Sequence, residues 1–158
     1  MVSGAAAGVV AAAVWAAAEP LAGRVFRTPY SDVRLLGRAL TSGRHWSAAG
    51  VAVHLVNGAI FGALFQRVLG GGPARGVAAA EVEHLALWPA ITVVDRLHPD
   101  RRRGAWPPLF ANGRVFVYEA TMHALFGAVL GLLTRRWEEA SLRSSARLPA
   151  EPPRLPRR

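Results

Sequence analysis

Six ionisable residues lie within, or at the edge of, four apolar stretches of this 158-residue sequence. They are three glutamates and three histidines: Glu19, His54, Glu81, His84, Glu119 and His123. A titratable side chain at membrane depth costs several kcal/mol unless it has a partner, so such residues are functional candidates. Imidazole and carboxylate groups together suit zinc, iron or manganese ions. A buried series of the same groups also suits a proton relay, because histidine titrates near neutral pH.

The apolar stretches that carry these residues are long enough, or nearly so, to cross a bilayer, which takes ~20 residues. They run over about 2–21, 46–69, 74–94 and 112–134. Only 18% of the residues are charged, and these are concentrated between the stretches. The sequence therefore predicts an all-α polytopic membrane protein with a four-helix transmembrane bundle. This membrane domain covers 1–137, and a basic, Pro/Arg-rich tail over 138–158 is expected to be disordered.

The charge balance is basic, with a net charge of +9, and all 19 cationic side chains are arginines. Because they flank apolar stretches, we expect Arg101, Arg102 and Arg103 to contact lipid head groups, and we expect no nucleic-acid partner. The Arg-rich connection after the first stretch favours an N-terminus outside the cell. The sequence contains no Cys, which excludes disulfides and thiolate metal ligands.

Small residues recur at steps of four in three of the stretches, and helices pack closely in lipid where small residues meet. The glycines concerned are Gly4 and Gly8, then Gly50, Gly58 and Gly62, then Gly127 and Gly131. Glu19, His54, Glu119 and His123 continue these rows, so they should face neighbouring helices. The same Gly-x-x-x-Gly pairs could instead drive self-association into a homo-oligomer.

The third stretch carries a polar row that begins at Glu81 and His84, whereas Glu83 points away from this row and receives no role. Because a helix rises ~1.5 Å per residue, the three histidines should lie near one level in the bilayer. We therefore predict that His54, His84, Glu119 and His123 approach one another. Glu81 and Glu19 would extend the cluster toward opposite membrane faces.

The connections carry further signals. Ser31 could cap a short amphipathic helix at the membrane surface, although a plain loop is the alternative. The glycine-rich turn at 70–73 predicts that the second and third spans are antiparallel neighbours. Pro89 predicts a kink in the third span.

Several functions fit the Glu/His cluster. Residues Glu81 to His84 form the Glu-x-x-His spacing of bundle di-iron sites, but the fourth stretch offers Glu119-x-x-x-His123 instead of a second copy. His54 and His123 could alternatively hold a haem. A proton-responsive protein, purely structural hydrogen bonding, and a non-enzymatic membrane scaffold or assembly protein remain open. The sequence contains no phosphate-binding loop, nucleophile elbow or catalytic triad, so we assign no enzymatic activity.

Several short motifs together resemble the YagU-type bacterial inner-membrane proteins, a small family of unsettled function. The matching positions are Trp15, Glu19 and Pro20; His54, Gly58 and Phe61; His84 and Pro89; Pro107 and Pro108; and Glu119 with His123. The resemblance covers about 130 residues in order and spacing. It implies a four-span protein of the bacterial inner membrane, and it supplies no reaction.

Overall fold

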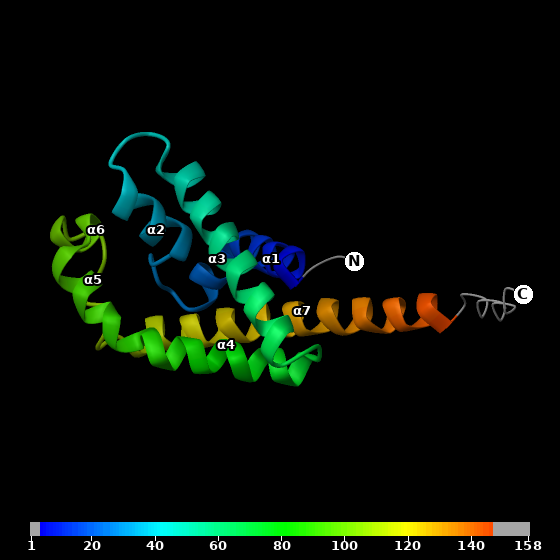
Figure 1. Ribbon diagram of the computed structural model, residues 1–158. Helices are drawn as coiled ribbons and strands as arrows, with labels where there is room; N and C mark the ends of the chain where they lie inside the picture. The colour runs from blue at the N-terminus through cyan, green and yellow to red at the C-terminus, as the bar shows by residue number, and fades with distance from the viewer. Residues whose placement is uncertain (1–3, 147–158) are drawn as a thin grey trace, which may run out of the picture.

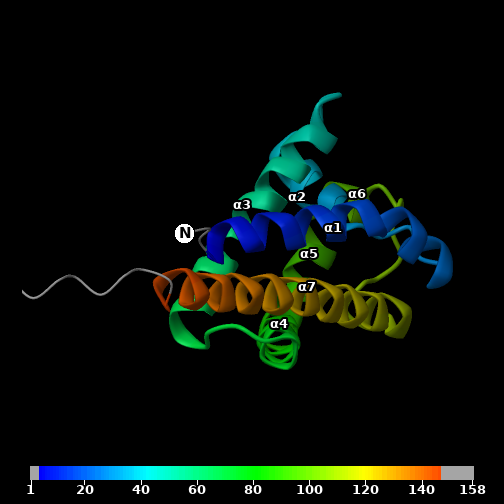
Figure 2. The same ribbon diagram turned by 90° about the vertical axis from the view of Figure 1, so that its right-hand side faces the viewer.

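The computed structural model describes residues 4–146, and in this range it contains helices and no strand (Figures 1 and 2). The main helices are α1 (Gly4–Val25), α2 (Asp32–Leu40), α3 (Trp46–Val68), α4 (Pro73–Leu87), α5 (Ile91–Leu97), α6 (Pro99–Arg102) and α7 (Gly113–Ala146), with a 3-10 turn, η1 (Trp88–Ala90), between α4 and α5. The predicted start of the first span at Val2 and the tail over 147–158 lie outside the described residues.

Four helical segments are long and apolar enough to cross a membrane: Gly4–Val25, Trp46–Val68, Pro73–Leu97 and Gly113–Ser144. The predicted all-α fold class is thus confirmed, and the spans match the expected order. One boundary is wrong, because α7 continues through Ala146 where the sequence predicted a disordered tail from 138. Ion pairs of Glu139 with Arg135 and Arg143, at i,i+4 spacing, support the added turns.

Backbone contact between glycines joins α1 to α3. A Cβ built on Gly8 would lie 1.8 Å from the carbonyl oxygen of Gly58, and one on Gly62 would lie 2.2 Å from the carbonyl oxygen of Gly4. No side chain fits at such distances, so only glycine allows the two helices to cross here. Small residues at the crossing let two backbones approach in lipid, where no hydrophobic force joins helices.

The same device joins α4 to α7, which lie side by side along most of the length of α4 (Figure 1). A Cβ on Gly76 would meet the carbonyl oxygen of Gly127 at 2.0 Å, and one on Gly131 would meet that of Gly72 at 2.2 Å. The three predicted Gly-x-x-x-Gly pairs are therefore buried inside this one chain. Self-association through those faces would require the helix pairs to separate first.

The expectation that the second and third spans are antiparallel neighbours is wrong. Helix α3 packs on α1 and α2, α4 packs on α7, and α3 and α4 diverge from the turn that joins them (Figure 1). Gly70 and Gly72, with φ of 68° and 131°, permit this turn in a conformation that side chains disfavour. Matching glycines, rather than the short connection, thus decide which helices pair.

The outer faces of α3 and α4 expose large apolar side chains, among them Val56, Ile60 and Leu64 on α3 and Val82 and Leu85 on α4. A soluble protein rarely leaves so much contiguous apolar surface uncovered. Lipid tails provide the matching environment, which agrees with the four candidate spans.

Pro89 bends the third span as predicted. The 3-10 turn η1 contains this proline, and α5 leaves the direction of α4 toward α2 and α6 (Figure 1). The amphipathic helix predicted after the first span is also present as α2, with Ser31 accepting a hydrogen bond from the amide of Arg34. Gly37 of α2 packs on the backbone of Trp46, so α2 is held against α3 and not by lipid alone.

Replacing Gly8 with Leu should force α1 away from α3. Overpacking costs ~1–3 kcal/mol in well-packed cores, and a clash with backbone falls at the upper end. We expect a lower free energy of unfolding in detergent, measured by circular dichroism during titration with a denaturing detergent. Gly113→Leu is the matched control, because nothing lies within 4 Å of a Cβ there. Equal stability of the two variants would contradict the glycine crossing.

Candidate metal centre

Helices α4 and α7 bring three predicted site residues together. His84, Glu119 and His123 each offer a ligand atom, and these atoms all lie within 4.8 Å of one another. His84 continues the buried face of α4 that begins with Gly76 and Ala80. Glu119 and His123 lie one turn apart on α7, on the face that carries Gly127. The glycine contact between the helices therefore also sets the spacing of the three side chains.

Local hydrogen bonding fixes the tautomer of His123. Its Nδ1 lies 2.8 Å from the backbone carbonyl oxygen of Glu119, and since a carbonyl only accepts, Nδ1 carries the proton. The Nε2 of the neutral ring then keeps a lone pair, and it lies 3.9 Å from a carboxylate oxygen of Glu83. A ligating histidine in proteins donates its other N–H to a carbonyl or carboxylate in this manner.

One atom of this cluster is buried and lacks a hydrogen-bond partner. It is Nε2 of His84, on a side chain that is 3% exposed. The Glu119 carboxyl, on a side chain that is 5% exposed, is hydrogen-bonded to Asp32. Buried polar atoms almost always have a hydrogen-bond partner, so a buried atom without one calls for an explanation. A cation bound to this atom would supply it, and the two imidazoles and the carboxyl group fit a metal ion.

His54, the third predicted histidine, lies close to the cluster but does not join it. The indole of Trp15 contacts both His54 and His123, with ring centroids 5.3 and 4.8 Å apart. Trp15 therefore links the two imidazoles, which do not stack on each other. A cavity of about 150 Å³ adjoins these residues. Pockets for drug-sized ligands start at ~300 Å³, so a haem held by His54 and His123 does not fit here.

The contacts of the two glutamates of α4 differ from those that the sequence predicted. Glu83, to which the sequence assigned no role, places a carboxylate oxygen 3.9 Å from Nε2 of His123. Glu81 is half-buried and makes no hydrogen bond or ion pair within the described part of the chain. The close packing of α4 on α7 places Glu83 beside α7. The only sequence signal for this position of Glu83 is its spacing from Ala79. Ala79 lies four residues earlier on the same helix face and packs against the core.

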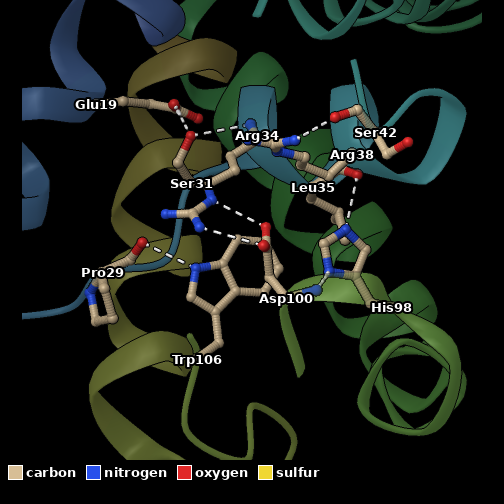
Figure 3. A network of polar contacts seen from close by, with 10 residues as sticks. All are labelled: Glu19, Pro29, Ser31, Arg34, Leu35, Arg38, Ser42, His98, Asp100 and Trp106. Atoms are coloured by element: carbon tan, nitrogen blue, oxygen red, sulfur yellow. Dashed lines mark hydrogen bonds and ion pairs between the residues drawn. The ribbon is translucent and has the colours of Figure 1, made fainter. Parts of the chain in front are cut away.

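Glu19 lies in a second cluster, where it caps α2 from outside the helix. Its carboxylate accepts hydrogen bonds from the amides of Asp32 (2.8 Å) and Val33 (3.2 Å) and from the Ser31 hydroxyl (Figure 3). The Trp15 indole N–H donates a further bond at 3.3 Å. A carboxylate at a helix N-terminus is stabilised by the helix dipole and the free amides. Glu19 therefore anchors α2 to α1, apart from the three-residue centre.

Asp32 is a site residue that sequence reasoning missed. It accepts a hydrogen bond from the Tyr30 hydroxyl at 2.9 Å, and its carboxyl is also hydrogen-bonded to Glu119. Burial and the nearby charge of Glu19 raise the pKa of Asp32 from 3.8 to about 7, against hydrogen bonds with Tyr30 and Glu119 that lower it. Glu119 therefore touches both clusters, and it connects the metal centre to the α2 cap.

A third group of polar contacts holds the connections together, and Figure 3 shows it beside Glu19. The Arg34 guanidinium pairs with Asp100 at 2.9 Å, and its carbon lies 5.6 Å from the Trp106 ring. His98 stacks on Trp106, donates to the carbonyl oxygen of Leu35 and accepts from the Asp100 amide. Burial lowers the pKa of His98, which suits this neutral, two-sided bonding.

The three arginines at 101–103 differ in their contacts. Arg101 donates to Asp95 at 2.7 Å and to the carbonyl oxygen of Trp106, so it holds the connection and is not free for lipid. Arg102 and Arg103 are exposed. The expected contact with head groups thus stays a prediction for these two residues only.

Comparison with protein-family models, curated proteins and solved structures finds no match for this chain.

The raised pKa of Asp32 predicts a pH-dependent stability. A carboxyl whose pKa is higher in the folded state holds its proton more tightly there, so folding stability falls as pH rises from about 4 to about 7. Asp32→Asn keeps the acceptor oxygen for Tyr30 and cannot ionise. We expect the variant to gain stability relative to the wild type as pH is raised through this window, measured by thermal unfolding in detergent. A stability difference independent of pH would contradict the assignment.

Proposed function

We propose that this chain is a multi-pass membrane protein that binds one first-row divalent transition-metal ion between α4 and α7, held by His84, Glu119 and His123. One observation carries the proposal. Three ligand atoms lie within 4.8 Å of one another, and Nε2 of His84 is buried without a protein partner. An apolar membrane interior makes such an atom costly, so it favours a bound cation.

The donor set narrows the class of ion. Two imidazoles and one carboxylate suit zinc, iron or manganese, and the absence of thiolates argues against soft ions such as Cu(I). A bound ion would supply a Lewis acid and open coordination positions. The hydrogen bond that Nδ1 of His123 donates to the Glu119 carbonyl oxygen would orient the imidazole and support its basicity.

A second candidate function is proton binding, favoured by the acid cluster around Asp32. Asp32, Glu19 and Glu119 interact closely, and the pKa of Asp32 near 7 would let protons load and leave at physiological pH. The scaffold hypothesis finds less support, because the glycine pairs on which it relied pack within the chain. The resemblance to YagU-type proteins, and with it the bacterial inner membrane, is part of the proposal.

The metal proposal predicts stoichiometric binding by the purified protein. In detergent, the wild type should bind about one Zn²⁺ or Co²⁺ per chain, measured by elemental analysis after gel filtration. Changing an outer partner of a metal ligand costs ~10- to 100-fold in affinity, so His84→Ala and His123→Ala should each lose at least that much.

His98→Ala is the matched control, because His98 is also buried but belongs to the network with Trp106. It should bind the ion with the affinity of the wild type. Metal-free wild type after incubation, or equal affinity in all variants, would refute the centre. Proton flux into liposomes that persists in His84→Ala but disappears in Asp32→Asn would support the second candidate instead.

A further inference from the structure

The cavity beside the metal centre has the lining of a cation-binding chamber. It is formed by side chains from α1, α2, α3, α4 and α7. Its polar lining consists of two carboxyl groups, two imidazoles, an indole and an amide: Asp32, Glu83, His54, His123, Trp15 and Asn57. No arginine lines it. The chamber therefore concentrates carboxyl groups and imidazole lone pairs without a fixed positive charge.

Residues of α3 and α2 line this chamber with groups that can bind a cation. His54 of α3 is 9% exposed, and its Nε2 has no hydrogen-bond partner. Asp32 of α2 supplies a carboxyl group. A cavity of about 150 Å³ has room for a hydrated cation, since one water takes ~30 Å³ of liquid volume.

The chamber also has a mouth and an inner end. Asp32 and Leu36 of α2 line one end, and α2 lies outside the four candidate spans. Asn57 and Glu83 lie at membrane depth, where polar groups are tolerated if they line a water-filled cavity. At the inner end, His123 belongs to both the chamber and the three-residue centre. An ion that enters beneath α2 would thus reach His123 directly.

We infer that this chamber is the entry site through which a divalent cation reaches His84, Glu119 and His123, with Glu83 and His54 capturing the ion on the way. The inference rests on the proposed metal centre and adds its access route. Clefts lined by one sign of charge raise the association rate of an oppositely charged ligand by ~10- to 1000-fold. Removing the capturing groups should slow loading without changing the ion's final environment.

The test is the rate of Co²⁺ loading, followed by stopped-flow absorption of the purified wild-type protein and its variants in detergent. His54→Leu and Glu83→Gln should each lower the association rate constant at least about tenfold. Both should reach the same bound stoichiometry and the same absorption spectrum as the wild type. The matched control His45→Leu alters an exposed histidine outside the chamber and should load at the wild-type rate.

The outcomes separate the two proposals. Normal stoichiometry with unchanged loading rates in both variants would overturn the chamber and leave the metal centre standing. A changed Co²⁺ spectrum in His54→Leu would also overturn it, because His54 would then be a ligand of the final site. No Co²⁺ binding by the wild type would overturn both. Glu83→Gln keeps the shape of a half-exposed side chain, so it reports on the rate even if His54→Leu fails to fold.

Discussion

The contact of backbone with backbone at paired glycines is the constraint on which this structure depends. In lipid, apolar side chains gain little by leaving their surroundings, so helices associate where their surfaces approach closely. Gly8 with Gly58, and Gly76 with Gly127, bring the helix pairs to distances that no Cβ would allow. This close approach also brings together the polar residues that lie one or two turns along the same helix faces.

This constraint accounts for the position of the candidate metal centre. His84 lies two turns beyond Gly76 on α4, and His123 lies one turn before Gly127 on α7. Because the glycines fix the register of the two helices, the imidazoles come to ring centroids 4.9 Å apart. His54 follows the register of the other pair, α1 with α3, and therefore faces Trp15 of α1. The two pairs meet through α1 and α7, and Trp15 fills that junction.

The sequence predicted the spans, the helix faces and the approach of His84, Glu119 and His123, because periodic spacing determines which side of a helix a residue occupies. It could not predict which helices pair. The short turn at Gly70 suggested that the second and third spans pack on each other, whereas the matching glycines pair each of them with another helix. The sequence pattern also did not predict that α2 packs back on α3. Asp32 belongs to a connection, and only the bond between Glu19 and the α2 amides places it beside Glu119.

The two clusters place opposite demands on Glu119. A metal ion favours its charged form, whereas Asp32 and Glu19 close by disfavour another negative charge. The conflict is least when Asp32 holds a proton, which its raised pKa permits near neutral pH. Asp32 would lose that proton more easily once a cation sits on the far side of Glu119. In the proposed metal centre, metal binding and proton release would therefore be linked through one carboxylate, Glu119.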